Sequence, residues 1–490
     1  MNKKSHSKDW RGNMLKATIG IEVHAELKSQ SKMYSHSLNH FNSEPNTNVN
    51  VIDLGYPGTL PVLNQAAIKM ALEAALAFHC NINQVMHFDR KNYFYPDLPK
   101  GYQITQQETP IGYDGYLEIE VNGTKKKIGI ERIHMEEDTC KSLHSGSETL
   151  LNFNRAGVPL IEIVSKPDME TPEEAMAYVE KLRETLLYLG ISDVKIEEGS
   201  MRCDTNVSLH EADSTVLGTK VEIKNIGSIR NVGLAIRHEM ERQAALLQGG
   251  TKLKEETRRF DDKTGTTVLM RVKETGNDYR YFPEPDLPPL FLNEEWIKEV
   301  RENLPILGDE IKEHYQVLGM NEKVIETLLR NKSLADFFNR LPCVQENNQV
   351  YAVRIANFLA GDVLSYLNKE KLTLQDIKLT EESLMDLVTT LENNEISSKQ
   401  AKEILDHLIK EGGSVASWIE TLGMKQNNNE EELNSIIMSI VDAHPESVLD
   451  YQAGLDRAVK FLMGQVMKET KGSANPGLAN KLLIAYLKTK

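Results

Sequence analysis

Acidic and histidine side chains alternate with apolar ones in residues 19–28, IGIEVHAELK. In a β-strand, successive side chains point to opposite faces, so Glu22, His24 and Glu26 would share one face and apolar residues would fill the other. Carboxylates and an imidazole in one row can bind a divalent cation. The same row also fits a strand whose polar face is simply solvated. The neighbouring segments decide between these two interpretations.

Three further segments show the same two-faced pattern. After a turn at Gly199-Ser200, residues 201–210 alternate apolar with polar side chains, and residues 219–226 do the same. The strand that leaves an expected hairpin at Asn122-Gly123 ends in another group of acids. The polar positions of these segments are Arg202, Asp204, Asn206, Ser208, His210, Lys220, Glu222, Lys224, His134, Glu136, Glu137 and Asp138.

The composition of these polar faces favours a binding site. Neighbouring strands of an antiparallel sheet lie about 5 Å apart, so polar faces from several strands come together. Asp, Asn and His fit strands poorly, and a purely solvated face would contain few of them. Carboxylates suit a hard cation such as Mg²⁺, and interleaved Lys and Arg suit an anionic ligand such as a phosphate. Zinc or another first-row metal at His24 is the weaker alternative, because one histidine on a strand is a poor zinc signal.

Several common catalytic motifs are absent from the sequence. There is no G-x-x-x-x-G-K-[ST] loop and no G-x-G-x-x-G turn after a strand. A nucleotide would therefore be held through metal and carboxylates instead of a phosphate-binding loop. The G-x-S-x-G and H-E-x-x-H motifs of serine hydrolases and zinc proteases are also missing.

Length, apolar content and cysteine spacing restrict the class of protein. A chain of 490 residues is too long for one core and suggests about three domains. No apolar run is long enough to span a membrane, and the polar N-terminus lacks a secretory signal, so we expect a cytoplasmic protein without a membrane segment. The four cysteines lie far apart with no C-x-x-C pair, which predicts reduced thiols and no thiolate zinc site.

The charge of the C-terminal segment differs from that of the whole chain. The net charge of −15 argues against nucleic-acid binding by the entire surface. Residues 456–490, however, contain seven Lys or Arg and only two acids. This local excess points to RNA, although a solvated helix face has the same composition.

The elements that must position these residues indicate an α+β protein. Period-two strands and a few helices fill the first part of the chain, and a helical pattern fills the rest. A proline-rich segment, YFPEPDLPPLF (281–291), and a polar segment, GMKQNNNEE (423–431), separate the units. The expected domains are an antiparallel-sheet domain over 14–290, an all-α helical domain over 291–422 and a small all-α tail domain over 430–490.

Local signals define individual elements. Thr171, Pro172 and Glu174 form the start of a helix that Gly190 ends. Further helices are expected over 64–78, from Ser228 to Gly249, around Leu433–Val441 and after Asn475-Pro476, on the basis of apolar period and end signals.

Long blocks of the sequence resemble the GatB family, the B subunits of glutamine-dependent aspartyl/glutamyl-tRNA amidotransferases. The resemblance runs from about residue 17 to the C-terminus. The blocks are IGIEVHAEL, EPNTNV, GYPGTLPVLN, FDRKNYFYPDLPKGYQITQ, HMEEDTCKS, NRAGVPLIEIVSKPD, VKIEEGSMRCDTNVSL, GTKVEIKNI, ETRRFD, DYRYFPEPDLPPL and NPGLANKLL.

The resemblance implies an ATP- and Mg²⁺-dependent carbon–nitrogen ligase with glutamine as the amido-nitrogen donor. Such a protein phosphorylates the side-chain carboxylate of Glu-tRNA(Gln) or Asp-tRNA(Asn), and ammonia from a partner glutaminase then displaces the phosphate. It works in a heterotrimer with the A and C subunits, and it contains a catalytic cradle domain, a helical domain and a YqeY-like tail domain that contacts tRNA. The alternatives are a stand-alone metal-dependent hydrolase and a non-catalytic tRNA-binding scaffold subunit. Which of the two tRNAs is the substrate stays open.

The resemblance also implies roles for individual residues. The expected magnesium ligands are Glu22, His24, Glu136 and Glu137, and the expected catalytic residues are Glu22, His24, Glu137 and Glu198. The expected ATP-binding residues are Ser200, Arg202, Asp204, Asn206, Lys220, Glu222 and Lys224. Glu26 is a further candidate near the same strand.

One departure from the family pattern concerns zinc. Some members carry four cysteines that resemble a zinc site beside the first strand, and this chain has Ser35, Ser37, Asn50 and Asp53 at the matching positions. Structural zinc is therefore not expected. Hydrogen bonds among these polar side chains are expected to replace part of its role.

Overall fold

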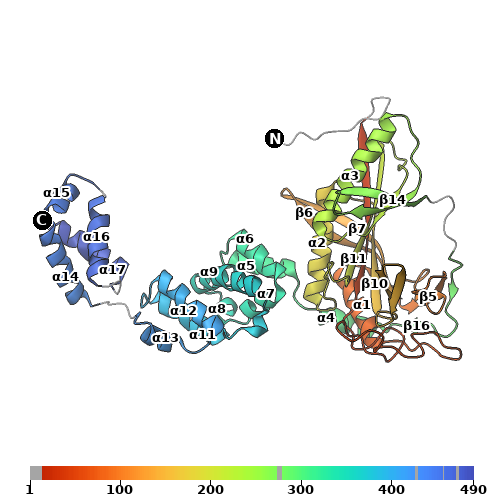
Figure 1. The fold of residues 1–490 in the computed structure, drawn as a ribbon, viewed down its shortest axis with the longest axis horizontal. Helices are drawn as coiled ribbons and strands as arrows, with labels where there is room; N and C mark the ends of the chain where they lie inside the picture. The colour runs from red at the N-terminus through yellow and green to blue at the C-terminus, as the bar shows by residue number, and fades with distance from the viewer. Residues whose placement is uncertain (1–13, 273–278, 425–428, 456, 471–473) are drawn as a thin grey trace. The chain divides into compact units, whose positions relative to one another are not determined.

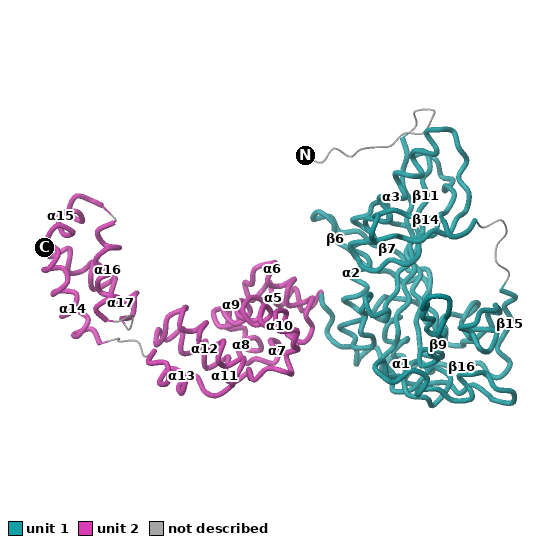
Figure 2. The backbone as a smooth tube through the Cα atoms, viewed as in Figure 1, with its two compact units in different colours: residues 1–308 teal, residues 309–490 magenta. Residues whose placement is uncertain are grey.

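The computed structural model describes residues 14–272, 279–424, 429–455, 457–470 and 474–490 (Figure 1). The chain forms two compact units, Met1–Gly308 and Asp309–Lys490 (Figure 2). The first unit extends past the boundary expected near residue 290. The reason is helix α4 (Glu294–Glu302), whose Ile297 and Val300 belong to the hydrophobic core of the first unit.

A nine-stranded sheet lies at the centre of the first unit, with the strand order β14-β13-β12-β11-β1-β10-β7-β6-β2. The strands are β1 (Leu15–Glu26), β2 (Asn81–Ile82), β6 (Gly112–Val121), β7 (Thr124–Glu137), β10 (Pro159–Ser165), β11 (Met201–Glu211), β12 (Val221–Lys224), β13 (Glu256–Asp261) and β14 (Thr266–Val272). Neighbouring strands are antiparallel except β12 and β13, which are parallel. This exception follows from helix α3 (Ile229–Gln248), which forms the crossover between them. The expected α+β fold with an antiparallel sheet is confirmed, with one parallel pair added.

The two faces of β1 differ as its sequence predicts. Ile19, Ile21 and Val23 are buried, whereas Glu22 and His24 lie between them on the opposite, partly exposed face. Helices α1 (Gln65–Ala77), α2 (Pro172–Leu189) and α3 contribute to the same hydrophobic core as the apolar side chains of β1 (Figure 1). The helices therefore cover the apolar side of the sheet, and the polar residues of β1 point to the other side.

The local signals in the sequence act as expected. Thr171 caps α2 by accepting a hydrogen bond of 3.1 Å from the backbone N–H of Glu174, and Gly190 ends the helix with a φ of 73°. The hairpin between β6 and β7 turns at Asn122-Gly123, where both residues have positive φ, 53° and 76°. Such a turn matches the twist of the two strands.

In the described part of the first unit, three small sheets accompany the large one. The first joins β15 (Phe282–Pro283), β4 (Asp89–Asn92) and β5 (Tyr102–Thr105). The second pairs β16 (Leu290–Phe291) with β3 (Val85–Met86), and the third pairs β8 (Lys141–Ser145) with β9 (Glu148–Asn152). The proline-rich segment was expected to separate two domains, but β15 and β16 attach its two ends to the first unit. Proline is tolerated there because these are short edge strands.

The second unit is helical throughout its described part. Its elements are α5 (Gly308–Val317), α6 (Glu322–Arg330), α7 (Lys332–Asn339), α8 (Pro342–Gln345), α9 (Gln349–Phe358), η1 (Leu359–Val363), α10 (Leu364–Glu370), η2 (Leu374–Asp376), α11 (Glu381–Glu392), α12 (Ser398–Lys410), α13 (Val415–Thr421), α14 (Glu430–Ala443), α15 (Pro445–Gln452), α16 (Arg457–Glu469) and α17 (Pro476–Leu487). Helices α14, α16 and α17 share a hydrophobic cluster of their own, which includes Leu433, Ile437 and Leu483. A separate tail domain stays a prediction that this cluster supports. Among the described residues we find no helix with the length and hydropathy needed to cross a lipid bilayer.

Candidate metal and nucleotide site

The register of four strands aligns charged side chains across the polar face of the large sheet. On β1, His24 lies opposite Arg202 of β11 on one side and opposite Glu162 of β10 on the other. On β10, Glu162 in turn lies opposite His134 of β7. Directly opposed side chains in a sheet are about 5 Å apart, so this register alone brings two imidazoles, a carboxylate and a guanidinium into one row.

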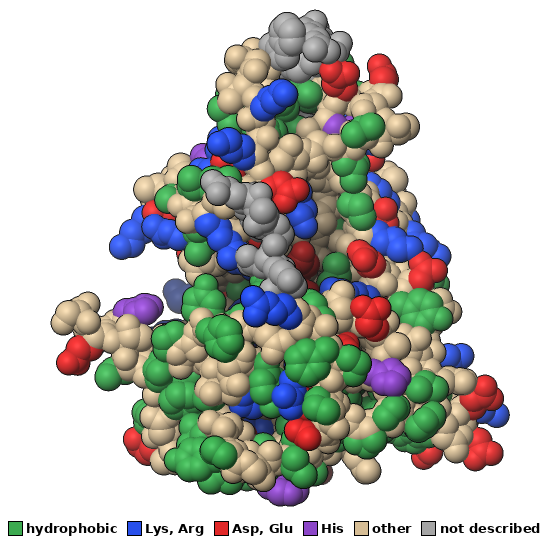
Figure 3. Space-filling model, turned by 90° about the vertical axis from the view of Figure 1, so that its right-hand side faces the viewer, with side chains coloured by type: hydrophobic (Ala, Val, Ile, Leu, Met, Phe, Trp, Pro, Cys, Tyr) green, Lys and Arg blue, Asp and Glu red, His purple; other side chains and the backbone are tan. Residues whose placement is uncertain are grey.

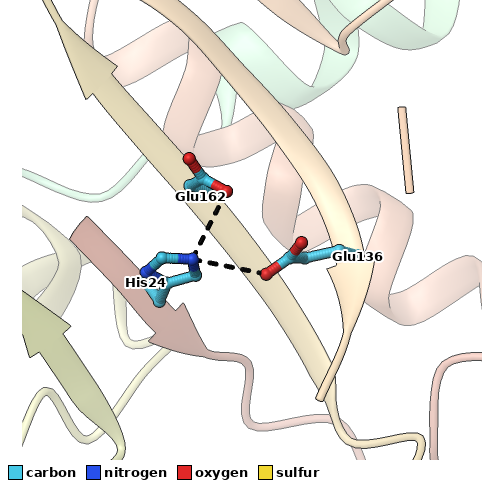
Figure 4. Close-up of side chains that lie close together, drawn as sticks. All are labelled: His24, Glu136 and Glu162. Atoms are coloured by element: carbon cyan, nitrogen blue, oxygen red, sulfur yellow. Dashed lines mark ion pairs between the residues drawn. The ribbon is translucent and has the colours of Figure 1, made fainter. Parts of the chain in front are cut away.

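A compact cluster forms where Glu136 joins this row (Figure 4). The Nε2 atom of His24 is 3.3 Å from an oxygen of Glu162 and 3.5 Å from an oxygen of Glu136. One ligand atom from each of the three residues lies within 4.8 Å of the others. A second histidine, His134, places its Nε2 atom 3.3 Å from the same Glu162 oxygen. We call His24, Glu136 and Glu162 the acid–imidazole cluster.

Burial and charge set the ionisation of this cluster. The side chains of Glu136 and Glu162 are 4% and 12% exposed, and that of His24 is 21% exposed. Burial opposes a charge on His24, but the carboxylates of Glu162 and Glu136 outweigh it and raise the pKa of His24 to about 9. Burial also opposes ionisation of Glu162, but His134 and His24 hold its pKa well below the usual range. The cluster thus keeps the carboxylate of Glu162 ionised although it is largely shielded from solvent.

The donors of the cluster suit a divalent cation. One imidazole nitrogen and two carboxylate oxygens can converge on a common point, and three protein ligands leave positions for water or substrate oxygens. Carboxylate oxygens favour Mg²⁺ or Mn²⁺, and the imidazole is also compatible with first-row metals. The buried carboxylates offer negative charge that a cation would neutralise.

A second polar group lies beside the cluster on β1, β11 and β12. The side-chain amide of Asn206 donates to Glu22 at 2.8 Å. Lys224 pairs with Asp204 at 2.5 Å and with Glu222 at 2.8 Å. Burial and the nearby Glu162 raise the pKa of Glu22. Burial would lower the pKa of Lys224, but the carboxylates of Asp204 and Glu222 outweigh this effect and raise it. Asp204, Asn206, Glu222 and Lys224 are predicted ATP-binding residues, whereas Glu22 is a predicted magnesium ligand and catalytic residue.

A pocket of about 240 Å³ opens next to this group. Glu22, Asn206 and Lys220 line it, together with the small residues Gly20 and Gly218. A lysine and a carboxamide facing a cavity can bind phosphate oxygens. Three of the predicted site residues therefore border one cavity.

The chain is similar to known proteins over nearly its whole length. The family described as "GatB/GatE catalytic domain" matches residues 17–298, and the family described as "GatB domain" matches residues 336–487. The B subunit of the aspartyl/glutamyl-tRNA(Asn/Gln) amidotransferase of Geobacillus thermodenitrificans (strain NG80-2) is 50% identical over 95% of this chain and 98% of the relative. The protein of the same name from Limosilactobacillus reuteri (strain DSM 20016) is 48% identical over 96% of this chain and 99% of the relative.

The chain belongs to the GatB family. Every residue of the acid–imidazole cluster and of the neighbouring pocket lies within the part that matches the catalytic domain. The family expectation drawn from the sequence blocks is confirmed.

Two of the expected metal ligands in this GatB chain lie apart from the cluster. Successive residues of a strand face opposite sides, so Glu137 points away from Glu136. Glu137 instead accepts a hydrogen bond from the side chain of Lys100 and one of 3.0 Å from the backbone N–H of Ile104. Glu22 forms its hydrogen bond with Asn206 and lines the pocket. Of the four expected ligands, the structure brings together His24 and Glu136.

Glu162 is the cluster member that sequence reasoning missed. It lies in the strand PLIEIVS of β10, where every neighbour in the strand except the final serine is apolar or proline. A single charged residue in such a strand is the signal that could have revealed it, because a carboxylate is seldom placed there without a partner.

Arg202 and Glu26 belong to a separate ionic group at the end of β1. Arg202 contacts Asp138 at 2.8 Å, and Arg155 approaches the same carboxylate at 3.5 Å. Burial and the charge of Asp138 raise the pKa of Glu26 to about 7. Arg202 is thus already paired with an acid, although it lies next to His24 in the register.

Glu198 and Ser200 are in the turn before β11. Glu198 pairs with Lys195 at 2.9 Å, and its side chain is 45% exposed. The hydroxyl of Ser200 accepts a hydrogen bond of 2.9 Å from the backbone N–H of Lys195. These contacts stabilise the turn, and the structure does not bring either side chain into the acid–imidazole cluster.

The positions that carry cysteines in some relatives form a hydrogen-bonded network here. The carboxylate of Asp53 accepts hydrogen bonds of 2.6 Å from both Ser35 and Ser37 and one of 3.0 Å from the backbone N–H of Asn50. It also pairs at 3.2 Å with Lys32, whose side chain is fully buried. The sequence predicted hydrogen bonds among the first four residues, but the lysine was not foreseen. Its ammonium provides a positive charge at the centre of this loop.

Proposed function

We propose that this GatB-family chain is the B subunit of an aspartyl/glutamyl-tRNA(Asn/Gln) amidotransferase, an ATP-dependent carbon–nitrogen ligase. Its reaction would amidate Glu-tRNA(Gln), Asp-tRNA(Asn) or both. The amidotransferase B subunits to which the chain is 47–50% identical support this proposal. The observation that carries it is the acid–imidazole cluster beside a lysine-lined pocket, on one face of one sheet.

The proposed reaction has two steps. First, a carboxylate oxygen of the aminoacyl side chain attacks the γ-phosphorus of ATP, the bond from that phosphorus to the bridging oxygen breaks, and ADP leaves. Second, ammonia attacks the acyl carbon, the bond from that carbon to the phosphate oxygen breaks, and inorganic phosphate leaves with the proton that the nitrogen loses. A carboxylate is a poor electrophile, and phosphorylation converts one of its oxygens into a leaving group.

The chain's own residues can supply positioning and charge for the first step. His24, Glu136 and Glu162 would hold Mg²⁺, which when bound neutralises charge on the transferred phosphoryl group. Lys220 lines the pocket and would contact phosphate oxygens. Asn206 fixes the orientation of Glu22 through their 2.8 Å hydrogen bond. Lys224 is held in place by two carboxylates and keeps its positive charge.

The same proposal includes partners. A glutaminase (the A subunit) would supply ammonia, the C subunit would complete a heterotrimer, and misacylated tRNA would be the substrate in the cytoplasm. The runner-up is a tRNA-binding scaffold without catalysis. A scaffold has no need for two nearly buried carboxylates beside a histidine, so the acid–imidazole cluster favours an enzyme. A stand-alone hydrolase would differ by turning over substrates without a partner.

The test is amidation by the reconstituted complex. Wild-type protein should convert Glu-tRNA(Gln) or Asp-tRNA(Asn) to the amide with Mg·ATP, and Glu162→Gln should remove tRNA-dependent ATP hydrolysis while glutaminase turnover remains. The matched control is Glu120→Gln, an exposed glutamate on β6 of the same sheet, which should behave like wild type. Full amidation by Glu162→Gln would refute the site, and no amidation of either tRNA by wild type would refute the function.

A further inference from the structure

A second, larger pocket lies at the small sheet formed by β4, β5 and β15. Its volume is about 740 Å³, and five aromatic side chains line it: Tyr93, Phe94, Tyr95, Tyr279 and Phe282. Figure 3 shows one side of the first unit, on which hydrophobic side chains lie among basic and acidic ones. This aromatic pocket is separate from the pocket lined by Glu22 and Lys220.

The aromatic rings are unusually exposed. Phe94 is 83% exposed, Tyr95 63% and Phe282 43%. Tyr93 contacts both Tyr95 and Tyr279 edge-on, with ring centroids 6.1 Å apart in each pair. Leaving several large rings in water is costly, so an exposed group of them indicates a binding surface.

Basic side chains line the same pocket as the aromatic rings. Lys91, Arg271 and Arg280 also line the pocket, and among the residues that the structure describes no acid does so. The Nζ atom of Lys91 is 5.1 Å from the centre of the Tyr279 ring. Rings that stack on bases, together with cations that attract phosphates, are the features that proteins use for single-stranded nucleic acid.

The aromatic pocket adjoins the acid–imidazole cluster. Lys91 lies opposite Gln103 in the β4–β5 pair, and the side-chain amide of Gln103 donates at 2.7 Å to the backbone carbonyl of Glu137 at the end of β7. The hydroxyl of Tyr93 donates to the same glutamine at 3.3 Å. The carboxylates of Glu136 and Glu162 also act on Lys91 and raise its pKa against the effect of burial. A ligand in the pocket would therefore end close to the cluster.

We propose that the aromatic pocket binds the single-stranded, aminoacylated 3′ end of tRNA, with its bases stacked on Phe94 and Tyr95 and its phosphates near Arg271. This inference rests on the proposed function, because the aminoacyl group must reach the acid–imidazole cluster. The adenine of ATP has the same stacking chemistry, but the smaller pocket beside Glu22 already offers ATP a site. The larger volume suits more than one nucleotide.

The test uses the full chain in its complex and a tRNA whose 3′-terminal adenosine is replaced by 2-aminopurine. Stacking quenches the fluorescence of this base, so wild type should quench it. The double variant Phe94→Ala/Tyr95→Ala should lose the quenching and raise the KM for aminoacyl-tRNA by about tenfold or more. The matched variant Phe94→Tyr/Tyr95→Phe keeps both rings and should match wild type. The KM for ATP and the glutaminase turnover should not change.

Three results would overturn the proposal. The first is unchanged quenching and an unchanged KM for aminoacyl-tRNA in the alanine variant. The second is a raised KM for ATP alone, which would assign the pocket to the nucleotide. The third is failure of the alanine variant to assemble with its partner proteins, which would make the pocket a protein interface. Quenching is measured on uncharged tRNA as well, so it decides on the pocket even if wild type amidates neither tRNA and the proposed function fails.

Discussion

The Nε2 atom of His24 lies 3.3 Å from a carboxylate oxygen of Glu162, its direct neighbour across the β1–β10 pair. The two residues are far apart in the sequence, and the register of two strands joins them. The pKa of Glu162 lies well below its usual range, and the pKa of His24 is raised to about 9, so both groups are charged near neutral pH. Without a metal, the protonated His24 and the ionised Glu162 therefore form an ion pair. The positive charge of the imidazolium then lies where a bound metal ion would supply it.

Metal binding should release a proton from His24. A metal ligand must be a neutral imidazole, and the pKa of His24 is about 9 in the metal-free protein, so Mg²⁺ must displace the proton near neutral pH. Apparent affinity should rise by about tenfold per pH unit and level off above the pKa of His24. Calorimetry in buffers of different ionisation enthalpy would measure the released proton. Binding without proton release would show that only the carboxylates contact the metal.

The metal-free protein should lose stability as the pH rises. The pKa of His24 is raised from 6.5 to about 9 on folding, so its contribution is fully present below pH 6.5 and disappears as the pH passes about 9. The loss should be on the order of 1–3 kcal/mol of the free energy of unfolding. Urea titrations of wild type and His24→Gln across this range would give the difference. A constant difference between the two proteins would contradict the prediction.

Glu162 and Glu137 should differ in metal binding. Glu162→Gln removes a ligand from the cluster and should lower the affinity for Mn²⁺ by about tenfold or more. Glu137→Gln changes a carboxylate that is bonded to Lys100 and Ile104, so it should leave the affinity near that of wild type. Electron paramagnetic resonance of free Mn²⁺ would measure both. Equal losses would mean that both carboxylates reach the metal.

The Lys32–Asp53 pair should be important for stability. Asp53→Asn would leave a fully buried ammonium without its counter-charge, at a cost of about 3–5 kcal/mol in the free energy of unfolding. Ser37→Ala removes one hydrogen bond to the same carboxylate and should cost about 1 kcal/mol. Urea denaturation would rank the two variants. A cost for Asp53→Asn no larger than that for Ser37→Ala would show that the ammonium relaxes to water.

The tail helices should bind tRNA through charge. Deleting residues 430–490 should weaken binding, and the salt dependence of the remaining affinity should be smaller. Of the predicted cations, Arg457 and Lys490 already pair with acids, and Lys471 lies outside the described residues. The remaining ones are Lys460, Lys468, Lys481 and Lys488, which are exposed. Removing one interaction with a phosphate should reduce the slope of log affinity against log salt by about 0.9. An unchanged slope in the deletion variant would contradict this.

Sequence patterns predict individual strands, helices and turns better than they predict which strands pair with each other. The alternation in β1, the cap at Thr171 and the turn at Asn122-Gly123 are local, so they could be read directly. The polar row of β1 could also be recognised as unusual. Its partner Glu162 could not, because pairing between β1 and β10 depends on the whole sheet.

Other features depend on details that a sequence pattern does not contain. Glu136 and Glu137 are adjacent acids, and only the strand phase decides which one meets His24. The buried Lys32 lies in an irregular loop, where no period marks a residue as inside. The prolines of residues 281–291 predict a break in regular structure, yet this segment contains the short strands β15 and β16.

The position of β1 in the sheet affects how the protein is made. The first strand of the chain lies between β10 and β11, which are synthesised much later. Until the ribosome has extended the chain through Ser165, both edges of β1 lack their partners, and the edge that pairs with β11 stays open until Glu211 has been added. Exposed strand edges invite aggregation. A newly made GatB chain therefore has a long interval in which β1 is prone to aggregation, and the acid–imidazole cluster can form only after β10 has been added.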